Sequence, residues 1–194
     1  MRQFLRFKHW QLFLLLYIIP LILEIIIFSS ITPFDKMFFI LLASTVIIFS
    51  IVFFGWFYSV DLYLHKRLPE TVQMNLKLFT VFLLIPALYI FFVCVFVLRN
   101  SGTLSNENNP APKLSGFLIP LHLFSIFCMF YCFYFIGKAL KAVELQRPVT
   151  FSDFAGEFFL IWFLPIGIWI LQPRINKIFS KAPDFVDRIS NQRT

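Results

Sequence analysis

The sequence predicts an all-α polytopic membrane protein, with four transmembrane helices followed by a C-terminal re-entrant or interfacial helical hairpin. Three observations lead to this fold class. Hydrophobic residues make up 59% of the 194 residues and charged residues only 14%, whereas soluble domains contain about 25% charged residues. Four apolar runs are long enough to cross a bilayer, and a fifth, shorter run is interrupted by proline and glycine. A soluble domain of this composition would expose more apolar surface than soluble monomers tolerate.

The four long runs each contain 20 to 23 residues, close to the ~20 residues that cross a ~30 Å hydrocarbon core as a helix. Lipid offers the backbone no hydrogen-bond partner, so spanning segments must be helical. We expect transmembrane helices over residues 10–31, 38–60, 76–98 and 117–136. Pro69 suits the first turn of a helix, and it predicts that the third helix starts there with polar turns. The chain is expected to form a single membrane domain over residues 1–194.

The fifth apolar run, residues 158–171, has only 14 residues and is broken around Pro165 and Gly167. A run of this length is more often re-entrant or interfacial than spanning. We therefore expect a re-entrant or interfacial hairpin over residues 151–172, followed by a cytoplasmic tail over residues 173–194.

The distribution of lysine and arginine tests this topology independently. With the N-terminus inside and four crossings, 14 of the 17 basic residues lie inside. If the fifth run also crossed, the ratio would become 9 to 8, and Asp153 and Glu157 would be buried. The strong positive-inside bias of membrane proteins favours four crossings with both termini in the cytoplasm. A fifth crossing is the alternative.

The segment between the fourth and fifth runs predicts an amphipathic extension of the fourth helix. Four charged residues recur there at every third position among apolar and small ones, namely Lys138, Lys141, Glu144 and Arg147. Pro148 stops this extension. Thr150, three residues before Asp153, has the spacing of a capping box and predicts a new helix start.

Glu24 and His122 are the unusual polar residues of the long apolar runs. A charged carboxylate at the depth of Glu24 costs roughly 2.5–3.5 kcal/mol on insertion scales. At 1.5 Å per residue, both side chains lie on the order of 8–11 Å below the outer edge. We expect Glu24 to contact His122, either as a packing pair between helices or as a proton or cation site. Pro20, one turn before Glu24, predicts a kink in the first helix.

Asp153, Glu157 and Arg174 flank the fifth run, and we name them the inner-face ledge. If the run is a hairpin, all three lie at the inner surface, where Glu157 can pair with Arg174. They are either solvated flanks or, with the helix break at Pro165 and Gly167, parts of a gate like the broken helices of transporters.

A second charged group follows the second predicted helix. It consists of Asp61, His65, Lys66 and Arg67. Its mostly basic character predicts contact with lipid headgroups.

No cofactor or metal is expected. Cys94, Cys128 and Cys132 all lie in apolar runs, where cysteine behaves as a small hydrophobic residue, and no Cys/His ligand spacing is present. The motifs of nucleotide-binding proteins, serine hydrolases and zinc proteases are missing. The net charge of +7 lies in short segments beside apolar runs, which indicates headgroup contact rather than nucleic-acid binding.

The segment EFFLIWFLPIGIWILQPRINKI, residues 157–178, resembles the C-terminal part of small, uncharacterised bacterial multi-pass membrane proteins. The resemblance covers about a tenth of the chain. It implies no activity, and it supports treating the last apolar run as a defined element.

Short loops, few intramembrane polar groups and no soluble domain predict a non-catalytic accessory or scaffold subunit of a larger assembly in the bacterial inner membrane. Its expected partners are the lipid bilayer and other membrane subunits or a second copy. One alternative is a small oligomeric transporter or channel that uses Glu24 and His122. A weaker alternative is a membrane-embedded enzyme that acts on lipids at the inner-face ledge.

Overall fold

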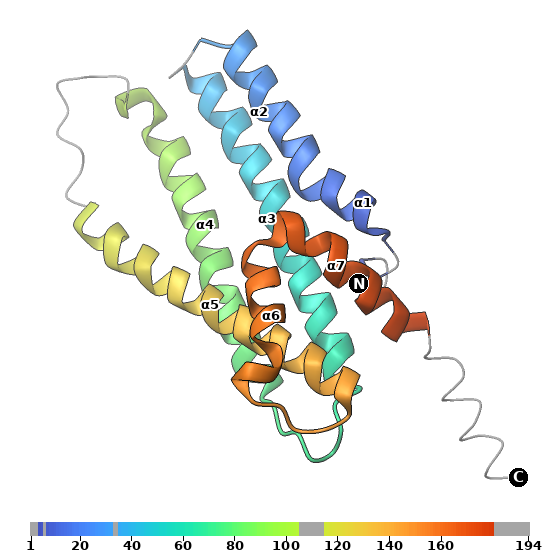
Figure 1. Ribbon diagram of the computed structural model, residues 1–194. Coiled ribbons are helices and arrows are strands. Elements are labelled where there is room, and N and C mark those ends of the chain that lie inside the picture. Colours follow the sequence, from blue (N-terminus) through green and yellow to red (C-terminus); the bar gives the residue numbers. More distant parts are fainter. Residues whose placement is uncertain (1–3, 6, 33–34, 105–114, 181–194) are drawn as a thin grey trace, which may run out of the picture. The chain divides into compact units, whose positions relative to one another are not determined.

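The computed structural model describes residues 4–5, 7–32, 35–104 and 115–180, and every regular element within them is a helix (Figure 1). Four of these helices are long and apolar enough to cross a membrane. They are His9–Ser30, Lys36–His65, Leu76–Arg99 and Leu118–Leu145. The all-α class and the four long apolar helices are thereby confirmed, and the structure supports a multi-pass membrane protein.

The first long helix consists of α1 (His9–Phe13), the π-helix η1 (Leu14–Ile18) and α2 (Ile19–Ser30). Pro20 lies in the first turn of α2 and has no N–H to donate to the carbonyl of Leu16. A wide π turn is one of the usual ways in which a helix absorbs such a disturbance. The irregularity predicted from Pro20 therefore takes the form of a π turn.

The next helices are longer than the apolar runs that predicted them. α3 spans Lys36–His65 and α5 spans Ser115–Leu145, because backbone hydrogen bonding continues until a stop signal is reached. The predicted extension of the fourth long helix is confirmed, although the helix ends at Leu145, before Arg147 and Pro148. It ends where Gln146 adopts a positive φ of 51° and donates its side-chain amide to the carbonyl of Val143 at 2.7 Å.

The prediction that the third helix starts at Pro69 is wrong, because α4 spans Leu76–Leu104. Pro69 instead lies in a turn, where its carbonyl accepts the Val72 N–H at 2.9 Å. Asn75 supplies the start signal: its side-chain oxygen accepts the N–H of Leu78 at 3.1 Å, as an N-cap residue does.

The fifth apolar run forms two helices, α6 (Phe151–Trp162) and α7 (Leu164–Ser180), which meet at Phe163 and pack against each other (Figure 1). The break thus lies two residues before Pro165. Pro165 falls in the first turn of α7, where a missing N–H costs nothing. The Phe163 carbonyl accepts the N–H of Gly167 at 2.8 Å.

α7 is longer than the sequence predicted. It continues through Pro173 to Ser180, so residues 173–180 of the expected tail are helical. Residues 181–194 lie outside the described part of the chain.

The chain forms two compact units, which we describe separately. The first unit comprises Met1–Phe13, Ser59–Met74 and Phe133–Thr194, and the second comprises Leu14–Tyr58 and Asn75–Cys132. The core of the first unit includes the buried side chains of Leu64, Ile136, Leu140, Phe154, Ile161, Ile168 and Leu171. In the second unit, many aliphatic and aromatic side chains are exposed, as expected for a lipid-facing surface.

Gly167 allows the two helices to meet so abruptly, and its replacement tests the turn. A Cβ atom at this position would lie 1.8 Å from the carbonyl oxygen of Leu160, a backbone atom that cannot rotate away. We expect Gly167→Ala to lower the free energy of unfolding by about 1–3 kcal/mol, as overpacking typically does. Thermal unfolding in detergent measures the change.

Gly156 on α6 provides the matched control, since a Cβ atom there meets nothing within 4 Å. Gly156→Ala should stabilise the protein by up to about 1 kcal/mol, because alanine is the better helix former. Equal effects of the two substitutions would contradict the assigned role of Gly167.

Candidate functional site

The candidate site lies in the first unit and is built around α7. It begins at the start of α6, where Thr150 is the N-cap residue, as predicted. Asp153 accepts the Thr150 N–H at 2.8 Å and the Thr150 hydroxyl at 2.9 Å, and it pairs with Arg147 at 3.1 Å. The backbone N–H of Thr150, then its hydroxyl, and Arg147 hold the pKa of Asp153 below its usual value.

The centre of the site is a group of four ion-paired residues, which we name the Arg174 cluster: Lys141, Glu144, Glu157 and Arg174. Arg174 binds Glu144 through two parallel contacts, Nε to Oε1 at 2.8 Å and Nη2 to Oε2 at 2.5 Å. Its Nη2 also donates to Oε1 of Glu157 at 2.6 Å, and Lys141 Nζ reaches the same oxygen at 3.2 Å. The cluster joins α5, α6 and α7, and its two positive charges balance its two negative charges.

Glu157 is the most buried member of this cluster, with 7% of its side chain exposed. Burial by itself raises the pKa of Glu157, but the hydrogen bond from Arg174 and the smaller contribution of Lys141 outweigh it, so the pKa is lower than usual. The two glutamates in turn raise the pKa of Arg174, with its hydrogen bond to Glu144 as the largest cause. Glu157 and Arg174 are therefore charged at neutral pH.

Close packing of α5 against α6 allows these ion pairs to form. A Cβ atom at Gly137 of α5 would lie 3.2 Å from the backbone nitrogen of Phe158, so glycine permits the two backbones to approach. Tyr134 and Phe154 extend the same contact, with ring centroids 5.1 Å apart.

Two amide side chains of α7 hold the N-terminal segment. Gln172 is fully buried and donates to the carbonyls of Phe4 and Phe7 at 3.2 and 3.0 Å. Asn176, one turn later, donates to the carbonyl of Phe7 at 3.1 Å. The Trp169 ring lies 4.8 Å from the ring of His9, so α7 holds this segment by polar and by apolar contacts.

The end of α7 is bound by the end of α3. The carbonyl of Ile178 accepts hydrogen bonds from the Tyr63 hydroxyl at 3.2 Å and from Arg67 Nη1 at 2.5 Å. The Arg67 guanidinium also lies over the Tyr63 ring, 4.7 Å from its centroid. A positive charge at a helix C-terminus is stabilising because it faces the negative end of the helix dipole.

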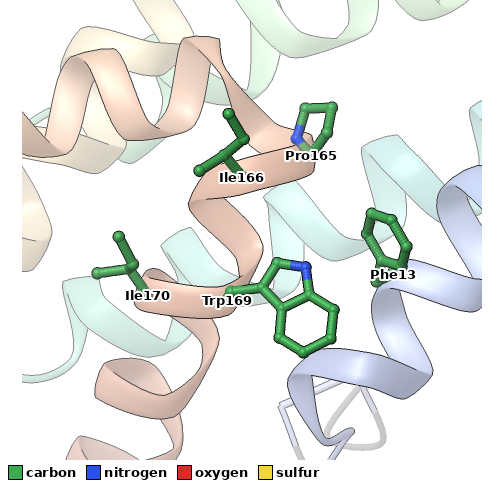
Figure 2. A pocket seen from close by; sticks show the side chains of 5 residues that line it. All are labelled: Phe13, Pro165, Ile166, Trp169 and Ile170. Atoms are coloured by element: carbon green, nitrogen blue, oxygen red, sulfur yellow. The ribbon is translucent and has the colours of Figure 1, made fainter.

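An open apolar depression of about 490 Å³ lies beside α7, lined by Phe13, Pro165, Ile166, Trp169 and Ile170. Figure 2 shows the Trp169 ring turned toward Phe13, and their centroids are 5.6 Å apart. The lining offers only apolar contact, which suits a lipid acyl chain and provides no group for catalysis.

The structure divides the predicted inner-face ledge. Glu157 and Arg174 are in contact, whereas Asp153 pairs with Arg147 instead. The sequence did not predict that Lys141 binds Glu157 or that Glu144 binds Arg174, although the three-residue spacing of Lys141 and Glu144 predicted the helix that contains them. In the segment LQPRIN, residues 171–176, every second residue is polar: Gln172, Arg174 and Asn176. So many polar residues beside an apolar run could have indicated that they bind other parts of the protein.

Glu24 and His122 lie in the second unit. Glu24 is half-buried in α2, and His122 is exposed on α5, where its ring lies 5.5 Å from that of Tyr89. No hydrogen bond or ion pair within the described residues joins them, and their contact stays a prediction.

Asp61 was expected after the second helix, in a basic turn that contacts lipid headgroups, but it is a residue of α3 and is 0% exposed. Neither of its carboxylate oxygens has a hydrogen-bond partner in the described structure, and the same is true of the buried Nδ1 of His65. The sequence could have indicated that these two groups share one face of a helix, because an aspartate and a histidine stand four residues apart at the end of an apolar run.

The described residues contain no group of three histidine, cysteine, aspartate or glutamate side chains that could hold a metal ion. Comparison of the chain with protein-family models, curated proteins and solved structures gives no match. The chemistry of the site therefore has to be inferred from its residues alone.

Arg174 bridges two glutamates on two helices, and lysine cannot reproduce this because its ammonium group is a single point charge. We expect Arg174→Lys to lower the free energy of unfolding by roughly 1.5–3 kcal/mol, the range for hydrogen bonds to charged groups. Arg147→Lys is the control, since 55% of the Arg147 side chain is exposed and such pairs contribute under about 1 kcal/mol. Both are measured by thermal unfolding in detergent, and a loss no larger than the control's would count against the bridging role.

Acid should weaken the Arg174 cluster. Because the folded-state pKa of Glu157 lies below its ordinary value of 4.5, its stabilisation is complete above about pH 4.5 and is lost as the pH falls through the folded-state pKa. The melting temperature of the wild type should therefore decrease on acidification in this range. Glu157→Gln should show a smaller decrease, because Asp153 still contributes, and identical pH profiles would refute the assignment.

Proposed function

We propose that this protein is a non-catalytic accessory or scaffold subunit of a bacterial inner-membrane assembly, with α6 and α7 forming a re-entrant or interfacial hairpin. The observation that carries the proposal is the closed Arg174 cluster. Its charges neutralise one another, and its buried glutamate is held by two cations. These groups stabilise the hairpin and are not available as an acid, base or nucleophile.

The contacts of α7 support a hairpin that returns to the side from which it starts. Gln172 and Asn176 bind the segment before the first long helix, and Ile178 binds the residues at the end of α3. Arg174 binds Glu144 near the end of α5. In a chain with four crossings these three helix ends share one side of the membrane, and contacts of ~3 Å do not bridge a core of ~30 Å.

The lengths and surfaces of the two helices support the same topology. At 1.5 Å per residue, 12 and 17 residues give about 18 and 26 Å, less than the hydrocarbon thickness. The side chains around the turn are apolar and exposed, including Trp162, Phe163 and Ile166, which is 67% exposed. Tryptophan at this position is typical of the membrane interface.

The exposed apolar turn suits contact with lipid and with a membrane-embedded partner subunit. The cytoplasmic location of both termini is supported by the predicted distribution of basic residues, 14 of 17 on that side. Lipid chemistry at the inner-face ledge is less well supported, because Glu157 and Arg174 bind each other.

Labelling of single cysteines tests the topology. In a background without the three natural cysteines, Ser152→Cys and Ser180→Cys flank the hairpin, and Ile166→Cys lies at its turn. We expect a membrane-impermeant thiol reagent to modify the two flanking positions from the same, cytoplasmic side and to leave position 166 unmodified. Modification of positions 152 and 180 from opposite sides would establish a fifth crossing.

The accessory role is tested by affinity purification from native membranes in mild detergent, followed by mass spectrometry. We expect a partner subunit to co-purify in a fixed ratio with the wild type. Ile166→Ser at the exposed turn should lose the partner without losing thermal stability, whereas Leu78→Ser, an exposed apolar residue near the start of α4, serves as the control that keeps it. Purification without any partner protein, or lipid turnover that is abolished by Glu157→Gln, would refute the proposed role.

A further inference from the structure

Asp61 and His65 lie in the first unit outside the Arg174 cluster, and both have buried polar atoms without a described hydrogen-bond partner. They are four residues apart on α3 and therefore share one face of the helix. Asp61 is completely buried, whereas His65 is the last residue of α3 and is half-exposed, with its Nδ1 atom buried. The histidine ring is thus partly exposed while its Nδ1 atom lies in the interior, on the same face of α3 as the aspartate.

The charged groups of the other elements of the first unit are engaged elsewhere. The described ion pairs join Lys141 to Glu157, Arg147 to Asp153, and Arg174 to both Glu144 and Glu157, and none includes Asp61. Lys138 lies over the Tyr134 ring at 5.9 Å, and Lys66 and Lys177 are exposed.

Tyr63 of α3 and Arg67, which follows α3, bind the carbonyl of Ile178. Tyr63 is two residues from Asp61, which is about 200° around a helix, so it faces away from the aspartate. Asp61 has no described cation or hydrogen-bond donor beside it.

A buried carboxylate without a partner is far less favourable when ionised than when neutral. A neutral carboxyl group has an O–H donor, and a neutral imidazole has one acceptor nitrogen. The four-residue spacing brings the two side chains within reach of each other, so a protonated Asp61 can donate to Nδ1 of His65 and satisfy both buried groups. Histidine is suited to pass this proton on because its ordinary pKa of about 6.5 lies near neutrality.

We propose that Asp61 and His65 form a proton-binding site in which Asp61 holds a proton and His65 exchanges it with water. In the exchange, the O–H bond of Asp61 breaks and an N–H bond forms at Nδ1 of His65, which becomes an imidazolium beside the Asp61 carboxylate. Rotation of the half-exposed ring brings Nδ1 to water, where this N–H bond breaks and a proton from water replaces the one released. The ring then rotates back, and Nδ1 returns the new proton to the carboxylate. The site is independent of the hairpin and goes beyond the accessory role.

Infrared spectroscopy of the purified full-length protein in nanodiscs tests proton binding. The C=O stretching band of a protonated carboxyl group is absent from a carboxylate. At neutral pH we expect this band in the wild type, a shift of the band when aspartate is labelled with carbon-13, and its loss in Asp61→Asn. Asp153→Asn is the control that keeps the band, since hydrogen bonds and Arg147 hold Asp153 ionised.

The spectrum of the labelled wild type tests whether Asp61 is protonated, even if the Asp61→Asn variant does not fold. A wild type without a label-sensitive band means that Asp61 is ionised, and this overturns the proposal. A band that persists in folded Asp61→Asn does the same.

Transfer into heavy water tests the role of His65. The band shifts as the carboxyl proton is replaced by deuterium, and we expect this shift to be roughly a hundred-fold slower in His65→Ala, the lower end of effects typical for removing a proton-transfer group. His122→Ala, which removes an exposed histidine of α5 in the second unit, should exchange at the wild-type rate. An unchanged rate in His65→Ala would show that the proton leaves by another path.

Discussion

The guanidinium group of Arg174 is the interaction on which the arrangement of the first unit depends. Its planar fork binds Glu144 of α5 through two parallel hydrogen bonds and has a further N–H for Glu157 of α6. Each glutamate is on a different helix, so one side chain joins three helices. A buried ion pair is not a large net source of stability, because both charges lose their hydration, but removing one partner leaves the other charge buried and unpaired. The cluster therefore specifies how α6 and α7 pack against the end of α5, and this specificity is its main contribution.

Besides its ion pairs with α5 and α6, α7 contacts two further segments of the first unit. Gln172 and Asn176 lie near Arg174 in sequence and bind the N-terminal segment, while the carbonyl of Ile178 accepts from Tyr63 and Arg67. Three polar side chains of the helix thus bind other parts of the protein, and apolar side chains such as Ile166 and Ile170 are exposed, while Ile168 and others are buried. A helix on the surface of a soluble protein instead exposes mainly polar side chains. The arrangement in α7 is the one expected for a short helix whose outer surface contacts lipid, and it connects the ion pairs physically with the proposed re-entrant hairpin.

Glu157 and Asp61 are both buried acids of the first unit, but their surroundings differ, and so do the roles that we assign to them. Glu157 is surrounded by cations that favour its ionised form, so it has no tendency to take up a proton at neutral pH. Asp61 is as deeply buried but has no cation or donor beside it in the described residues, and burial alone favours the protonated form. A carboxyl group that is neutral in the folded protein and adjacent to a half-exposed histidine can exchange a proton. A carboxyl group therefore stabilises helix packing at Glu157 and is proposed to exchange a proton at Asp61.

The sequence by itself determined the four long helices, the extension of the fourth beyond its apolar run and the start of α6 after Thr150. The length of an apolar run and the residues that cap a helix are local properties, so they can be recognised without knowledge of the fold. Local signals also misled: Pro69 lies in a turn, and the break attributed to Pro165 and Gly167 falls at Phe163. Only the tertiary structure decided that Arg174 also binds Glu144 and that Gln172 binds carbonyls of the N-terminal segment, because these partners are 30 to 168 positions away in the chain. It also decided that Asp61 is buried, since burial depends on neighbouring elements rather than on local sequence. The charge pattern of the sequence predicted that Glu157 pairs with Arg174. It did not predict their partners on α5, because those contacts depend on the close packing of α5 and α6 that Gly137 permits.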